Sequence, residues 1–262
     1  MRLLILVLNS LLLGVMVMAV PDLRDQLEKV LEASVQIVGE RTIPVGDFDV
    51  GLKVMGSGTV IKKNGRTFIV TAAHVVDFLK DTVAYIDEED GREKKKVIYK
   101  DAWVIKEKVK NGRKVAENRI LVKVLFSSRM EEEGGDDIAV LEAYDDEELR
   151  HGVEPLPKGV DLWVGQRCWH VGSLLGKLVN SLAEGNIAAL GRIIEDKPFH
   201  QIAGSAMPGS SGGGVFVEHN GKIYYAGMIT RGIGETVNFF VPIERMRSAL
   251  KEAPEGVREV LE

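Results

Sequence analysis

Pro208-Gly209-Ser210-Ser211-Gly212-Gly213-Gly214, followed directly by Val215-Phe216-Val217, is the stretch that decides how this chain folds. A run of glycine and serine is also typical of a flexible linker. Here, however, the run lies between strand-like segments and ends in an apolar run that predicts a buried strand. The glycines permit backbone conformations closed to other residues and let another chain come close. The sequence therefore predicts an ordered, tight turn that presents a serine hydroxyl.

Ser211 has the surroundings that a nucleophilic serine needs. The backbone N–H of Gly209, two residues earlier, can point with the N–H of Ser211 at a single spot. Two such donors stabilise the negative oxygen that develops when a hydroxyl attacks a carbonyl carbon. We therefore interpret Ser211 as a candidate nucleophile, and Gly209 and Ser211 as a candidate oxyanion hole.

A serine hydroxyl is a weak nucleophile until a neighbouring base takes its proton. His74, in the segment Thr71–Val76, follows a β-branched strand and is the candidate base; a histidine buried in the core is the alternative. Asp137 opens the apolar run 137–141, where a partly buried carboxylate needs hydrogen-bond donors such as an imidazole N–H. An ordinary acidic turn is the alternative at that position. Together, the three segments indicate a triad of His74, Asp137 and Ser211.

The chain order His74, Asp137, Ser211 resembles that of the chymotrypsin/trypsin superfamily. In α/β-hydrolases the order is serine, acid, histidine, and in subtilisins it is aspartate, histidine, serine. More narrowly, the chain is similar to the HtrA/DegP-type bacterial branch from about Ser34 to Met246. The segments that carry this resemblance are Gln201–Gly213, Val171-Gly172-Ser173, Gly185–Arg192 and Phe239-Phe240-Val241-Pro242.

The resemblance implies a trypsin-like serine endopeptidase that cleaves protein or peptide substrates through an acyl-enzyme. In that reading His74 is the general base, Asp137 orients its ring, and no cofactor or metal is needed. The alternative is a catalytically silent two-barrel module that binds a peptide or serves assembly. Homo-oligomer formation stays open, because relatives of this branch are often trimers and no trimer surface is recognisable in the sequence.

The expected fold is all-β, with two six-stranded antiparallel β-barrels packed across a catalytic cleft. Leu23, Leu27, Val30 and Leu31 recur at helical spacing and predict a short N-terminal helix, and a C-terminal helix is expected near 242–250. The expected divisions are 1–20, a signal peptide or membrane anchor; 21–34, a helical lead-in; 35–145, the N-terminal barrel; 146–160, a linker; 161–243, the C-terminal barrel; and 244–262, a helix and tail.

Charge and composition limit the partners, disulfides and metal sites that this chain can be expected to have. The net charge of −5 gives no broad basic surface, so nucleic acid is not an expected partner. Cys168 is the only cysteine, which excludes an intrachain disulfide and predicts a buried structural thiol. The other histidines show no metal-ligand spacing. These histidines are His151, His170, His200 and His219.

The N-terminus predicts export. Arg2 precedes an apolar run, Leu3–Val20, and Val17 and Ala19 have the small-residue spacing of a cleavage site. We expect removal after Ala19 and a periplasmic or extracellular protein. A retained anchor is the alternative, because about 18 apolar residues can just span a bilayer.

The chain departs from its relatives in two ways. HtrA proteins normally carry a PDZ domain, but fewer than about 20 residues follow the last expected strand, so no such domain is expected. Ser210 stands where trypsin-like zymogens have an aspartate, so activation by a new N-terminus at Ile37 is not expected either.

By the same resemblance, a primary specificity pocket is expected beside Ser211. No acidic residue lies at its base, so a preference for lysine or arginine is not expected, and small or medium apolar side chains are favoured. Arg231 and His200 leave an acidic preference as the alternative. The expected pocket residues are Ser205, Thr230, Arg231 and Gly232, with the region of Val237 and Asn238.

Overall fold

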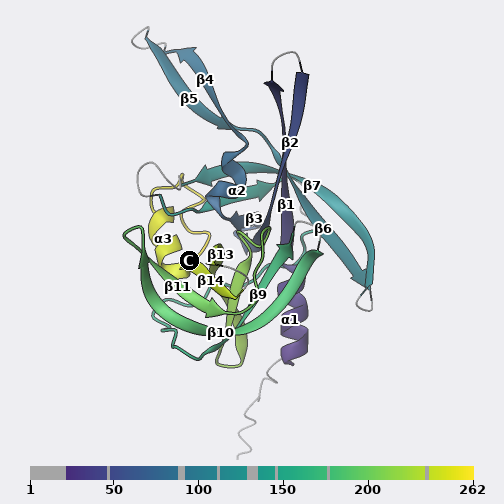
Figure 1. Cartoon of the computed structure of the whole chain (residues 1–262), viewed down its shortest axis with the longest axis vertical. Coiled ribbons are helices and arrows are strands. Elements are labelled where there is room, and N and C mark those ends of the chain that lie inside the picture. Colours follow the sequence, from purple (N-terminus) through teal and green to yellow (C-terminus); the bar gives the residue numbers. More distant parts are fainter. Residues whose placement is uncertain are drawn as a thin grey trace, which may run out of the picture.

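Two closed β-barrels, each of six antiparallel strands, form the body of the protein (Figure 1). The computed structural model describes residues 22–45, 48–87, 92–110, 113–128, 135–144, 147–175, 178–233 and 236–262. The predicted all-β fold with two barrels, a short N-terminal helix and a C-terminal helix is confirmed.

The first barrel runs in the strand order β1-β2-β3-β8-β7-β6. Asn64 and Gly65 both have positive φ, 51° and 73°, and form the tight turn expected between β2 and β3. β4 and β5 form a separate hairpin that extends away from the barrel (Figure 1). The elements of this half are α1 (Leu23–Glu32), β1 (Ser34–Val45), β2 (Phe48–Lys63), β3 (Arg66–Thr71), α2 (Ala73–Asp77), β4 (Lys80–Ile86), β5 (Glu93–Tyr99), β6 (Ala102–Lys110), β7 (Arg113–Ser127) and β8 (Ala139–Ala143).

The second barrel runs in the order β10-β11-β14-β13-β12-β9. Two of its hairpins turn on residues with positive φ, Glu195-Asp196 and Asn220-Gly221, which matches the turn geometry that suits twisted strands. Its elements are β9 (Arg167–Leu174), β10 (Leu178–Ile194), β11 (Lys197–Ala203), β12 (Gly214–His219), β13 (Lys222–Ile233), β14 (Val237–Pro242) and α3 (Ile243–Leu250).

Each barrel is filled by apolar side chains. Trp169 and Tyr225 are fully buried in the second barrel, and Phe68 is buried in the first. Cys168 is a free thiol inside the second barrel, and burial raises its pKa to about 12. A thiol that stays protonated is a poor nucleophile, so Cys168 acts as a packing residue.

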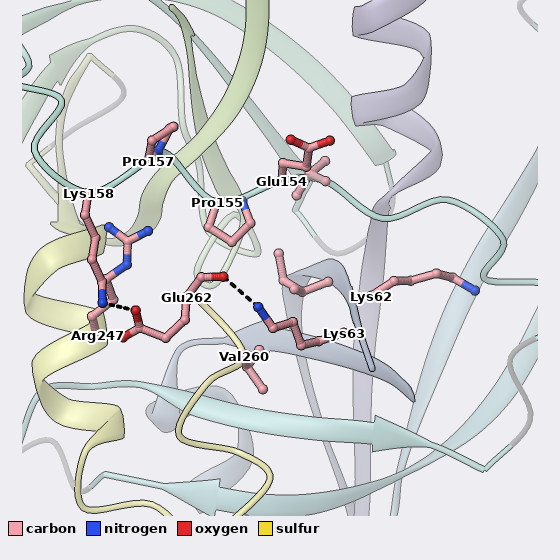
Figure 2. A pocket seen from close by; sticks show the side chains of 11 residues that line it. Lys62, Lys63, Glu154, Pro155, Pro157, Lys158, Arg247, Val260 and Glu262 are labelled. Carbon is pink, nitrogen blue, oxygen red and sulfur yellow. Dashed lines mark hydrogen bonds and ion pairs between the residues drawn. The ribbon is translucent and has the colours of Figure 1, made fainter. Parts of the chain in front are cut away.

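Arg247 of α3 lies beside Lys158 and Glu262, where the C-terminal tail meets the segment between the barrels (Figure 2). Its guanidinium donates to the carbonyls of Leu261 (2.8 Å) and Leu156 (2.6 Å). Lys63 of the first barrel donates to the main-chain oxygen of Glu262 at 2.8 Å, and Lys158 pairs with the Glu262 carboxylate. The cavity of about 510 Å³ at this place contains none of the predicted site residues. It therefore belongs to the attachment of the tail.

The predicted signal peptide or anchor, residues 1–20, lies outside the described residues and stays a prediction. Within the ranges that the structure does describe, none of the helices has the length and apolar character required to cross a bilayer.

His170 of β9 is buried directly beneath the serine loop. Its Nδ1 lies 3.0 Å from the carbonyl oxygen of Gly214, which can only accept, so Nδ1 carries the proton. A Cβ atom on Gly213 would lie 2.7 Å from the ring, so glycine is required there. Burial lowers the pKa of His170 to about 4 from its usual 6.5. The imidazole is therefore neutral in the folded protein at neutral pH.

This burial makes stability depend on pH. Between pH 6.5 and about pH 4 the unfolded chain binds a proton at His170 and the folded chain does not, so the free energy of unfolding rises with pH in this window. We expect acidification across the window to remove about 3 kcal/mol through His170 alone. Urea unfolding of the parent and of His170→Asn at several pH values measures the difference. His219→Asn, which removes a partly exposed imidazole, should keep the parent's slope; equal slopes for the parent and His170→Asn would contradict the prediction.

Candidate active site

His74 and Asp137 are in direct contact. His74 is the second residue of α2, and its Nδ1 lies 3.1 Å and 3.0 Å from the two carboxylate oxygens of Asp137. The backbone N–H of His74 also donates to Asp137 Oδ1 at 3.0 Å. A carboxylate only accepts, so Nδ1 carries the proton and Nε2 is the basic nitrogen. The Asp137 side chain is 3% exposed and that of His74 is 31% exposed, so the carboxylate is buried and the imidazole is accessible to a ligand.

The turn that carries Asp137 is tied to the second barrel. Asp137 has a left-handed backbone, with a φ of 56°, which aspartate tolerates better than most residues. Its neighbour Asp136 pairs with Arg245 of α3 at 2.9 Å and with Lys197 of β11 at 3.2 Å. Lys197 also donates to the carbonyl of Gly135 at 2.6 Å. These contacts hold the buried carboxylate in place from across the interface between the barrels.

A second carboxylate, Asp77, lies three residues after His74 in α2. Burial raises the pKa of Asp77, and the negative charge of Asp137 raises it further, while Lys80 and His74 lower it. In the described structure Asp137, and not Asp77, makes the hydrogen bonds to the imidazole.

The loop that carries Ser211 has every carbonyl from residue 208 to residue 211 bound by a donor. Gly209 and Gly212 have φ values of 95° and 84°, which glycine alone adopts without strain. The donors are Leu175 N–H to the Pro208 oxygen (2.7 Å), Ser57 Oγ to Gly209 (2.7 Å), Gly213 N–H to Ser210 (2.8 Å) and Ser57 N–H to Ser211 (2.8 Å).

Two backbone N–H groups of the same loop are available to a ligand. Within the described part of the chain, the N–H groups of Gly209 and Ser211 donate to no protein acceptor. In a trans peptide the N–H points opposite to the preceding C=O. The carbonyls of Pro208 and Ser210 are each held by a backbone donor, so the N–H groups of Gly209 and Ser211 each point away from that donor. This arrangement can receive a negatively charged oxygen.

The serine loop packs against the strand end that precedes His74. Thr71 Oγ1 donates to the carbonyl of Ser57 at 2.7 Å, and Ser57 N–H holds the carbonyl of Ser211. A Cβ atom on Gly212 would lie 2.2 Å from Thr71 Oγ1. The fold thus brings the serine loop beside the segment that leads into His74. Among the described residues Ser211 and His74 make no side-chain hydrogen bond; such bonds are often long in ligand-free sites.

The expected pocket residues lie on and beside β13, and the structure pairs their charges. Arg231 binds Glu195 at 2.6 Å, and its guanidinium lies over the ring of Phe199. The Nδ1 atom of His200 accepts from the N–H of Gly191 at 3.1 Å, and burial lowers the pKa of His200. Of the two groups that suggested an acidic preference, the charge of Arg231 is therefore balanced by Glu195, and His200 is kept neutral.

The remaining pocket residues are uncharged. Thr230 is buried, whereas Ser205 and Gly232 are exposed. Asn238 donates to the carbonyl of Gly204 at 2.7 Å and so holds the loop that leads to Ser205. In the described ranges, no group of three or more His, Cys, Asp or Glu side chains is placed to hold a metal ion.

Two residues at the site were not predicted from the sequence. Ser57 holds the serine loop from the first barrel, and Glu195 pairs with Arg231 from the turn between β10 and β11. The glycines on both sides of Ser57 were a usable signal, since paired glycines in a strand mark a close backbone approach. Glu195 carried no such signal.

Comparison with known proteins gives this arrangement a family. Residues 56–224 match the model of the trypsin-like peptidase domain. No curated protein matches the chain. The solved structures that match include the HtrA-type protease AlgW with decapeptide (16% identity, 87% of this chain, 67% of that chain, TM-score 0.57), Deg5 (23%, 85%, 89%, 0.54) and the serine endoprotease from Yersinia pestis (20%, 92%, 67%, 0.58).

At these identities the solved structures show a shared fold, and the family model supplies the relationship. It covers more than half of the sequence, from Gly56 in β2 to Tyr224 in β13, and so includes all three predicted triad positions. The resemblance to trypsin-like proteases predicted from the sequence is therefore confirmed. The chain belongs to the family of trypsin-like peptidase domains.

Proposed function

We propose that this chain is a serine endopeptidase that cleaves peptide bonds through an acyl-enzyme, with Ser211 as nucleophile, His74 as general base and Asp137 as the residue that orients His74. The family and the shared fold support a protease. The observation that carries the finer assignment is the buried contact of 3.0 Å between His74 Nδ1 and Asp137, which leaves Nε2 as the basic nitrogen.

In the proposed reaction, Ser211 Oγ attacks the carbonyl carbon of the substrate while His74 Nε2 takes the hydroxyl proton. Asp137 stabilises the imidazolium that results. The N–H groups of Gly209 and Ser211 stabilise the oxyanion. His74 then gives its proton to the leaving amine, and water, activated by His74, hydrolyses the acyl-enzyme.

The proposed substrates are proteins or peptides with a small or medium apolar side chain before the cleaved bond. A related fold has been solved with a decapeptide, which supports peptide binding. The pairing of Arg231 with Glu195 and the neutral His200 favour apolar over acidic side chains. Export of the protein remains part of the proposal and rests on the apolar run 3–20.

Ser211→Ala should abolish both peptide hydrolysis and labelling by a fluorophosphonate, because only an activated serine reacts with that reagent. The loss in kcat should be on the order of 10⁶-fold, as when the triad of a comparable protease is removed. Ser181→Ala, which removes a serine from β10 outside the candidate site, is the matched control and should label like the parent. A parent that binds peptides but takes up no label would instead be the silent binding module.

Asp137→Asn should lower kcat by about 10⁴-fold while the protein stays folded, because an amide cannot stabilise the imidazolium or fix the Nδ1–H tautomer. Steady-state kinetics on a fluorogenic peptide give the value. Asp161→Asn makes the same chemical change at an exposed position in the segment between the barrels and should leave kcat unchanged. Equal kcat values for Asp137→Asn and the parent would remove Asp137 from the mechanism.

A peptide-library profile of the parent should be dominated by apolar residues before the cleaved bond. Glu195→Gln removes the carboxylate that pairs with Arg231 and should raise cleavage after glutamate, relative to leucine, by up to about fivefold, because a partly exposed ion pair is worth little. Glu184→Gln breaks the exposed pair with Arg167 instead and should leave the profile unchanged. A parent profile dominated by Glu or Asp would reverse the assignment.

A further inference from the structure

Ser57 connects the first barrel to the serine loop through all of its polar groups. It lies in β2 and is 1% exposed. Its N–H donates to the Ser211 carbonyl (2.8 Å), its carbonyl accepts from Thr71 Oγ1 (2.7 Å), and its hydroxyl donates to the Gly209 carbonyl (2.7 Å) and accepts from the Ser173 N–H (2.7 Å).

The two contacts of the hydroxyl fix its direction. The Gly209 carbonyl can only accept, so the Ser57 hydroxyl hydrogen must point at it. The Ser173 N–H can only donate, so it uses a lone pair of the same oxygen. A hydroxyl ordinarily rotates to suit its surroundings, but this one has a single arrangement that satisfies both partners.

Ser57 also sits where the strand comes unusually close to the site. A Cβ atom on Gly56 would lie 2.6 Å from both methyl groups of Val75 and 3.2 Å from the Ser211 carbonyl. A Cβ atom on Gly58 would lie 2.6 Å from Ile69. Gly56 therefore lets β2 lie close to both Val75, the residue after His74, and the Ser211 carbonyl, where the Ser57 hydroxyl reaches the Gly209 carbonyl.

The Gly209 peptide is the part of the loop that most needs such a contact. Gly209 has a positive φ of 95° and no side chain that could restrict the rotation of this peptide. Ser210 N–H binds the Met207 carbonyl at 2.9 Å and holds one end of the peptide, and Ser57 holds the other. Without the hydroxyl, the Gly209 carbonyl is left unpaired and the loop must turn to find a donor, which moves the adjacent N–H groups.

We propose that Ser57 is a positioning residue whose hydroxyl holds the N–H groups of Gly209 and Ser211 in the geometry that receives the oxyanion. This inference rests on the proposed peptidase function. A hydroxyl that only braces the barrels would affect stability, whereas a positioning hydroxyl also affects how tightly the transition state is bound relative to the substrate.

The test compares Ser57→Ala with Ser34→Ala. Ser34 is also a buried serine of the first barrel, and its hydroxyl makes one hydrogen bond, to Val30, away from the site. For Ser57→Ala we expect kcat per fluorophosphonate-titrated enzyme to fall by about 10- to 100-fold with KM changed less than about threefold. The affinity for a peptide boronate, a transition-state analogue, should fall by the same factor as kcat/KM. Ser34→Ala should match the parent in all three values.

A second pair of variants separates the effect of the Ser57 hydroxyl on catalysis from its effect on folding. Ser57→Thr and Ser57→Val have the same shape and differ only in whether the hydroxyl is present, so their shared packing cost cancels. The threonine variant should exceed the valine variant in kcat by about 10- to 100-fold, with similar unfolding midpoints. Equal kcat values for this pair, or a Ser57→Ala enzyme that matches Ser34→Ala, would overturn the inference. A parent that neither labels nor cleaves would overturn the proposed function instead.

Discussion

The buried carboxylate of Asp137 is the constraint around which the site is arranged. A carboxylate with 3% of its surface exposed must receive hydrogen bonds, because an unpaired buried charge is very costly. It receives them from the backbone N–H and the ring of His74, which lies in the first turn of α2, two residues after the start of the connection from β3. Satisfying the carboxylate therefore also sets the ring's position and its tautomer. The adjacent Asp136, bound to Lys197 and Arg245, extends the same constraint to the second barrel.

The second barrel supplies the serine loop, which lies near His74 and Asp137 and whose carbonyls at residues 208–211 all accept hydrogen bonds. A peptide unit has one donor and one acceptor, so holding the carbonyls of residues 208–211 also decides where the intervening N–H groups point. Two of the four donors to those carbonyls belong to Ser57 of the first barrel. The proposed base and the proposed oxyanion donors thus come from different barrels, and the segments that carry them both contact β2 at Gly56 and Ser57. Relative motion of the barrels would disturb both through Ser57 and its neighbours.

Much of the fold could be predicted from the sequence, because its signals are local. The Asn64-Gly65 turn, the helical spacing in 22–33 and the strand-like runs of the second half depend on residues close together in the chain. The candidate triad could be predicted because chain order and short flanking motifs survive without contacts. The roles of Ser57 and Glu195 could not, since each depends on a partner more than 30 residues away, Gly209 at a separation of 152 and Arg231 at a separation of 36. The sequence showed Arg231 as a cation near the pocket, and only the β10–β11 hairpin brings its counter-charge.

Two residues near the site, Leu175 and Asp137, have left-handed backbone conformations. Most non-glycine residues with positive φ here are asparagine, aspartate or glutamate, and those in the β-hairpins form tight turns, where such conformations are expected. Leu175 is different: a left-handed conformation costs a residue with a Cβ atom about 1–2 kcal/mol, and leucine has no polar side chain to offset it. Its N–H holds the Pro208 carbonyl, which directs the Gly209 N–H. Asp137, also left-handed, accepts hydrogen bonds from the backbone N–H and the ring of His74. Strain of this kind persists only where surrounding contacts over-determine it, and here those contacts are the ones that orient His74 and the N–H group of Gly209.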